Sequence, residues 1–193
     1  PQRARDMYSA ALAKAALMDA RREAGGPVRK ALDACNRVLL ALDKEDWLER
    51  DFDSRPSPPE DVARALQRFV GAVGEQLAAT PLFLQQRPRL LSFYFDCLQF
   101  QRVLEVFDGD FAFEMKRSRR KQSLVLRLRC LDASRLLAER QDQPVAVVAF
   151  SATASPPRWM LSELGLGEGA VFRSLPSPFS PAQFRVELNT GLD

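Results

Sequence analysis

Two hydroxyl side chains, Ser151 and Thr153, follow the apolar run Val147-Val148-Ala149-Phe150 and precede two prolines. A short, continuous apolar run is typical of a strand buried on both faces of a sheet. At the carboxyl end of such a strand, hydroxyls donate and accept hydrogen bonds at the edge where α/β proteins keep their sites. The same residues fit a second interpretation, in which Thr153 or Ser155 caps the helix that follows Pro156.

The chain lacks the residues on which most hydrolases depend. None of its 193 residues is a histidine, which excludes Ser-His and Cys-His pairs and removes the commonest general base. Cys35, Cys97 and Cys130 lie far apart among apolar neighbours, which favours buried free thiols in a reducing cytosol. Cysteine and histidine together cannot supply the four ligands of a structural zinc site or an iron–sulfur cluster. We therefore expect no metal site and no self-contained catalytic centre.

Positive charge is concentrated in residues 116–129, which hold seven basic and no acidic side chains. The rest of the chain carries 21 basic against 25 acidic residues, so the net charge of +3 is a local feature. The segment predicts either contact with a nucleic-acid backbone or a solvated hairpin tip. Arg127 and Arg129, which alternate with leucines, also fit pairing with acidic side chains. The candidate nucleic-acid contacts are Lys116, Arg117, Arg119, Arg120 and Lys121.

Helical patterns dominate the first hundred residues. Residue spacing and helix-forming composition predict helices over residues 5–23, from Pro27 onward, over 59–79 and over 90–107, with a proline-rich loop at 51–59. The apolar side of the second helix holds Val28, Leu32, Cys35, Leu39 and Leu42. The fourth helix is rich in aromatic residues, which indicate a helix-bundle core rather than a platform for stacking bases.

The pattern changes after residue 107. Two strands are predicted at 111–115 and 124–128, separated by a polar turn. Asp132 is placed to cap a short helix that begins at Ser134. The remaining predicted elements are a strand at 145–150, a helix at 158–164 ended by Gly165, and a strand at 170–173. The predicted fold class is mainly α with an α/β part.

Three short segments carry a family resemblance through their order. They are "RARDMYSAAL" (residues 3–12), then "RCLDAS" (residues 129–134, with Asp132 and Ser134), then Ser151-Ala152-Thr153 followed by Pro156, Leu164-Gly165 and Ser177-Pro178-Phe179. The first resembles the segment after the Asp-Glu-Ala-His box of DinG/XPD-type DNA helicases of superfamily 2. The second resembles the Cys-x-Asp-x-Ser segment of that family, and the third resembles its motif III with the residues beyond it.

The resemblance implies a fold and a division into domains. It implies a helical arch, here residues 1–107 with a leading helix, inserted into a RecA-like motor domain with a parallel sheet. Residues 108–193 would be part of that motor domain. The start at Pro1 without an initiator methionine indicates a piece of a longer protein. No apolar run approaches the roughly 18 residues of a membrane helix, and the cysteine pattern favours a cytoplasmic location.

The resemblance also implies an activity for the longer protein, which is ATP-dependent DNA unwinding with 5′ to 3′ polarity. The arch would grip single-stranded DNA, and Ser151, Ala152 and Thr153 would couple ATP hydrolysis to strand separation without being catalytic. The phosphate-binding loop, the Asp-Glu-Ala-His box and the second motor domain are not in this chain. ATP and Mg²⁺ would therefore be bound elsewhere, as would any iron–sulfur cluster, whose presence the resemblance leaves open.

A second hypothesis belongs to a different class of protein. The bundle-like first half and the missing catalytic groups also fit a non-enzymatic helical module that binds a protein partner. A phosphate-binding loop and an Asp-Glu-Ala-His box encoded upstream of Pro1 would exclude that hypothesis.

Overall fold

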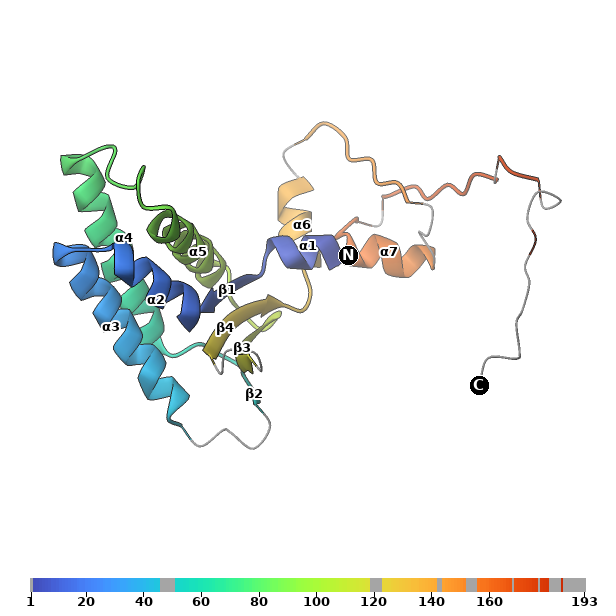
Figure 1. Cartoon of the computed structure of the whole chain (residues 1–193). Helices are drawn as coiled ribbons and strands as arrows, with labels where there is room; N and C mark the ends of the chain where they lie inside the picture. The colour runs from blue at the N-terminus through green and yellow to red at the C-terminus, as the bar shows by residue number, and fades with distance from the viewer. Residues whose placement is uncertain are drawn as a thin grey trace.

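The computed structural model describes residues 2–45, 51–118, 123–141, 144–151, 156–167, 169–176, 178–180 and 185. Their helices are α1 (Gln2–Met7), α2 (Lys14–Glu23), α3 (Gly26–Asp43), α4 (Glu60–Ala79), α5 (Pro88–Glu105), α6 (Ser134–Gln141) and α7 (Pro157–Glu163). Their strands are β1 (Ala10–Ala13), β2 (Phe52–Arg55), β3 (Phe111–Ser118) and β4 (Ser123–Cys130). Figure 1 shows α2, α3, α4 and α5 gathered on one side of the strands. The fold is mixed α and β, as predicted.

The strands form one four-stranded sheet in the order β1-β4-β3-β2, and every neighbouring pair is antiparallel. The prediction that the strands after residue 107 belong to a parallel sheet is therefore wrong for β3 and β4. Only four residues separate Ser118 from Ser123. A parallel pair needs a crossover of about a dozen residues or more, whereas so short a connection joins antiparallel neighbours.

The two outer strands come from segments for which the sequence predicts other structures. Residues 5–23 form α1, β1 and α2 rather than one helix, and the predicted loop at 51–59 contains β2. Ala10 pairs with Leu128 on β4, and Phe52 pairs with Lys116 on β3. Backbone pairing with a strand far along the chain overrides the local preference in both cases. The sheet therefore joins residues from both sides of the expected boundary at residue 107.

The helices bury one face of the sheet. All five residues predicted for the inner side of α3 are buried, and so are Leu12 on β1 and Leu126 on β4. Phe93 and Phe100 of α5 are buried, and the rings of Phe93 and Phe69 lie 5.5 Å apart. The prediction of an aromatic core is confirmed for these residues. On the same helix, Phe95 is 59% exposed.

All three cysteines are free and buried, as predicted. Burial raises the pKa of the Cys35 thiol to about 12, against a smaller opposing effect of its backbone hydrogen bond. Burial likewise raises the pKa of Cys130 to about 11. Because thiolates are the reactive form, these two side chains are unreactive at neutral pH.

After β4 the chain forms α6 and α7 at nearly the residues that the sequence predicts. The strands predicted at 145–150 and 170–173 are wrong, since the structure has no ladder at these residues. Val145, Val148 and Phe150 are instead 107%, 84% and 95% exposed. A strand forms only where a neighbour accepts its hydrogen bonds, and the described residues supply none here. None of the helices in the described part of the chain has both the length and the apolar character that a membrane crossing requires.

Asp43, at the end of α3, connects two other elements. Its carboxylate accepts hydrogen bonds from Lys14 Nζ on α2 (3.0 Å) and from Arg117 Nε on β3 (3.1 Å). Arg117 also donates to the backbone oxygen of Asp43 at 2.7 Å. Burial alone would raise the pKa of Asp43, but the hydrogen bonds from Lys14 and Arg117 bring it below its ordinary value.

We expect Asp43→Asn to lower the free energy of unfolding by about 1–2 kcal/mol at neutral pH. Because the pKa is lowered in the folded state, the ion pairs contribute fully above about pH 4, the ordinary aspartate value. That contribution is lost as the pH falls through the folded pKa. Urea unfolding from about pH 7 down to pH 2 should therefore show a smaller acid-induced loss in the variant than in the wild type.

Asp19→Asn is the matched control, because Asp19 is 44% exposed and pairs only with the 71% exposed Arg22 among the ion pairs of the described residues. This change should cost less than about 0.5 kcal/mol. Equal losses in the two variants would show that Asp43 does not connect α2, α3 and β3 energetically.

Candidate functional site

Two of the three segments that resemble helicase motifs meet at the end of β4. The backbone N–H of Cys130 donates to the Ser9 hydroxyl oxygen at 3.0 Å, and that hydroxyl donates to the Arg5 carbonyl at 2.7 Å. Together with the pairing of β1 and β4, these bonds place residues 3–12 against residues 129–134 (Figure 1). The structure thus brings together two of the three segments, although 121 positions separate Ser9 from Cys130.

Asp132 caps α6, as the sequence predicts. Its carboxylate accepts a hydrogen bond from the backbone N–H of Ser134 at 2.8 Å. Bonds from the backbone and the hydroxyl of Ser134 lower the pKa of Asp132, with a smaller contribution from the charge of Arg5 and an opposing effect of burial. A carboxylate with a lowered pKa suits the positive end of a helix. Its role in the described structure is to orient α6.

The loop after α7 packs directly on α6. Gly165 has a φ of +64°, its N–H donates to Ser162 O at 2.8 Å, and Leu166 N–H donates to Leu161 O at 2.9 Å. These two bonds and the left-handed glycine make a Schellman motif, which ends α7. Gln141 of α6 donates to the Leu164 carbonyl at 2.6 Å.

An ion pair connects this part of the chain to α1. Arg5 of α1 bonds to Glu163 of α7. The Leu164-Gly165 pair singled out by sequence is therefore a docking point between α6 and α7, and the ion pair ties α7 to the element that precedes β1.

The third segment is only partly within the described residues. Ser151 is exposed at the end of an extended, exposed stretch, whereas Ala152 and Thr153 lie outside the described residues. Ser177 also lies outside them, while Pro178 and Phe179 are exposed, Phe179 by 73%. The role predicted for Ser151, Ala152 and Thr153 therefore stays a prediction.

The basic residues divide between two faces of the sheet. Arg117 faces the helices and bonds to Asp43, so it is engaged in the fold. Lys116 is exposed on the opposite face, diagonal to Arg127 of β4, and Arg129 follows Arg127 on the same face. The other predicted nucleic-acid contacts, Arg119, Arg120 and Lys121, lie outside the described residues.

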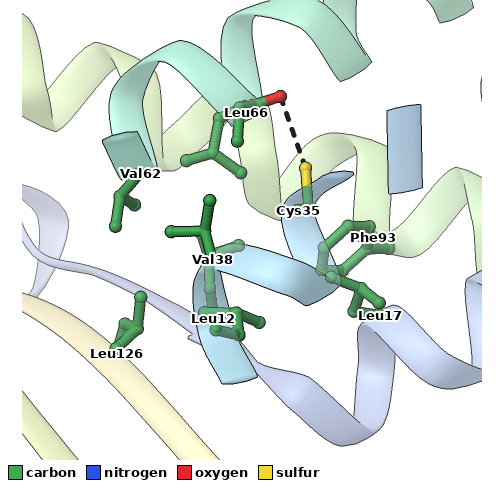
Figure 2. Close-up of a pocket in the computed structure, with 10 residues that line it drawn as sticks. Leu12, Leu17, Cys35, Val38, Val62, Leu66, Phe93 and Leu126 are labelled. Atoms are coloured by element: carbon green, nitrogen blue, oxygen red, sulfur yellow. Dashed lines mark hydrogen bonds between the residues drawn. The ribbon is translucent and has the colours of Figure 1, made fainter. Parts of the chain in front are cut away.

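One cavity lies inside the helix–sheet core. It has a volume of about 10 Å³ and is lined by apolar groups that include Leu12, Leu126 and Phe93 (Figure 2). The Cys35 thiol at its edge donates to the Ala65 carbonyl at 3.3 Å. Ligand pockets are roughly thirtyfold larger or more and carry placed polar groups. This cavity is a packing gap, and it offers no room for a nucleotide.

The described residues contain no group of three or more His, Cys, Asp or Glu side chains able to hold a metal ion. We assign no step of ATP hydrolysis to the residues in this part of the chain. Comparison with models of protein families gives no match for this chain, and comparison with curated proteins finds no relative of significant similarity.

Proposed function

We propose that this chain is part of an ATP-dependent DNA helicase similar to the DinG/XPD type. In this proposal the helices α2 to α5 belong to the arch, and the residues after β4 belong to the first motor domain. Ser151, Ala152 and Thr153 transmit the state of the nucleotide to the DNA-binding surface. ATP and Mg²⁺ are held by parts of the protein that this chain does not contain.

The observation that carries the proposal is the contact between the two ends of the helical segment. An inserted domain leaves its host and returns to it at one place. Here Ala10 pairs with Leu128, and Ser9 accepts a hydrogen bond from Cys130. The helices α2, α3, α4 and α5 are folded from the residues in between. Such an arrangement is what the family resemblance requires of residues 3–12 and 129–134.

A second observation supports the proposal that residues 145–150 pack against a part of the protein that this chain does not contain. Val145, Val148 and Phe150 follow α6 and are almost fully exposed. Exposed apolar residues that follow one another mark a surface that another structure covers. In the proposal that structure is the rest of the motor domain, and the apolar segment leads directly to Ser151.

The first test is the polypeptide encoded by the complete gene. We expect a phosphate-binding loop and an Asp-Glu-Ala-His box upstream of Pro1, and ATP hydrolysis that single-stranded DNA stimulates. A Ser151→Ala/Thr153→Ala variant of that polypeptide should keep hydrolysis and lose most strand separation. The present chain alone should hydrolyse no ATP.

The opposite results would favour the interaction module. Absence of both motifs upstream, or ATP hydrolysis that ignores DNA, would contradict a helicase. Equal loss of hydrolysis and strand separation in the double variant would contradict coupling by these hydroxyls. The loss of a coupling residue should reduce strand separation more than ATP hydrolysis.

A further inference from the structure

The face of the sheet that points away from the helices, called here the open face, carries a row of exposed cations. Its central row of paired residues runs Ala11, Arg127, Glu114, Ser54 across the four strands. The next row runs Ala13, Val125, Lys116, Phe52. Arg129, opposite Ala112, follows Arg127 on the same face.

The open face is positively charged. Lys116, Arg127 and Arg129 are exposed, and the small side chains of Ala11 and Ser54 leave them accessible. Residues two apart on a strand lie about 7 Å apart, and diagonal neighbours across strands lie about 7–8 Å apart. The three cations therefore form a line rather than a cluster.

Among the paired strand residues that the structure describes on this face, Glu114 is the acidic one, and it is largely neutralised. Its side chain is 11% exposed, and its carboxylate accepts a hydrogen bond from Arg129 at 3.1 Å. Arg127 lies directly opposite it in the strand pairing. The positive charge of Lys116 and Arg127 is left to attract a partner.

Phe52 adds an exposed aromatic ring beside the cations. It pairs with Lys116 in the strand register and is 45% exposed. An aromatic ring next to a line of cations can stack an unpaired base while the cations contact phosphates. A duplex does not offer an unstacked base, whereas open faces of four-stranded antiparallel sheets can bind single strands in this way.

We propose that the open face binds single-stranded DNA, with Lys116 and Arg127 on the phosphates and Phe52 against a base. The choice of DNA as the ligand rests on the proposed function, but the surface is defined by the sheet alone. It differs from the predicted site, because Arg117 belongs to the opposite face and Phe52 and Arg127 take its place.

The test is a titration of the chain with fluorescein-labelled oligo(dT) of 20 nucleotides, followed by anisotropy at several salt concentrations. We expect Lys116→Gln/Arg127→Gln to weaken binding about tenfold at low salt. The slope of log affinity against log salt should fall by about 1.4, at about 0.7 per lost phosphate contact. Arg64→Gln/Arg68→Gln on the exposed side of α4 removes the same charge and should change affinity less than twofold.

Two single variants test whether DNA binding depends on specific contacts or only on the net charge of the face. Phe52→Ala should weaken binding about fivefold or more without changing the salt slope. Glu114→Gln should tighten binding, because it removes the acid and releases Arg129, whereas a purely structural role of Glu114 would give weaker binding or unfolding. Thermal unfolding followed by circular dichroism checks that each variant is folded.

Several results would overturn the inference. These are no binding of oligo(dT) by the wild type, equal effects of the two double variants, or equal affinity for duplex DNA or poly-glutamate. If the complete protein shows DNA-stimulated hydrolysis while the open-face variants bind normally, this inference fails and the proposed function stands. If the open face binds DNA but the complete protein does not hydrolyse ATP, the proposed function fails and this inference stands.

Discussion

Replacing Phe93 by alanine is expected to lower the free energy of unfolding by about 3–5 kcal/mol. Phe93 is 1% exposed and packs against Phe69 with the ring centres 5.5 Å apart. It also lines the small cavity shared with Leu12 of β1 and Leu126 of β4 (Figure 2). Removing the ring would enlarge a gap that the surrounding helices and strands cannot fill without moving. The loss is large because the ring is buried and borders the cavity between the helices and the sheet.

Urea unfolding followed by circular dichroism measures this change, with amide exchange in β4 as a second signal. Phe95→Ala is the control, because Phe95 is on the same helix but 59% exposed. The control should change stability by no more than about 0.5 kcal/mol. Similar effects of the two changes, or a β4 that stays protected when α5 unfolds, would contradict a shared helix–sheet core.

Replacing Gly165 by alanine is expected to release α7 from α6. A Cβ atom at this position would lie 2.2 Å from the backbone oxygen of Ser134 and 2.8 Å from the backbone nitrogen of Ala138. Neither backbone atom can rotate away. The φ of +64° adds a strain of about 1–2 kcal/mol for any residue with a side chain. The Schellman motif and the bond from Gln141 to Leu164 should both be lost.

Hydrogen exchange at the amides of Gly165 and Leu166 reports this loss directly, because both are bonded within the motif. We expect their protection to fall at least tenfold, while the helix–sheet core keeps its stability. Gly167→Ala is the control, since a Cβ atom there meets nothing within 4 Å. Unchanged protection in Gly165→Ala would show that α7 does not dock through this glycine.

The elements with strong local signals were predictable. The inner residues of α3 recur at helical spacing, so their burial follows from the sequence. Alternating leucines in β4 predict a strand with one buried face, and Asp132 predicts the start of α6. These signals act within a few residues, and nothing elsewhere in the chain opposes them.

The outer strands were not predictable, because their conformation depends on distant partners. Residues 10–13 are alanine and leucine, which favour helix in isolation, yet they pair with β4. Residues 52–55 have the composition of a loop and pair with β3. The open face could not be foreseen either, because Phe52 and Arg127 come together only through these pairings. One signal was available, since Arg127 and Arg129 alternate with buried leucines.

The sequence by itself determined the helices from α3 onward, the β3–β4 hairpin, the cap at Asp132 and the buried thiols, because each depends on residue type or short spacing. Only the tertiary structure decided that the sheet is antiparallel and that residues 3–12 lie against residues 129–134. It alone separated Arg117 from Lys116 by placing them on opposite faces. The reason is physical. A strand is stable only when its backbone hydrogen-bonds to another segment, and the residues of the strand do not determine which segment that is.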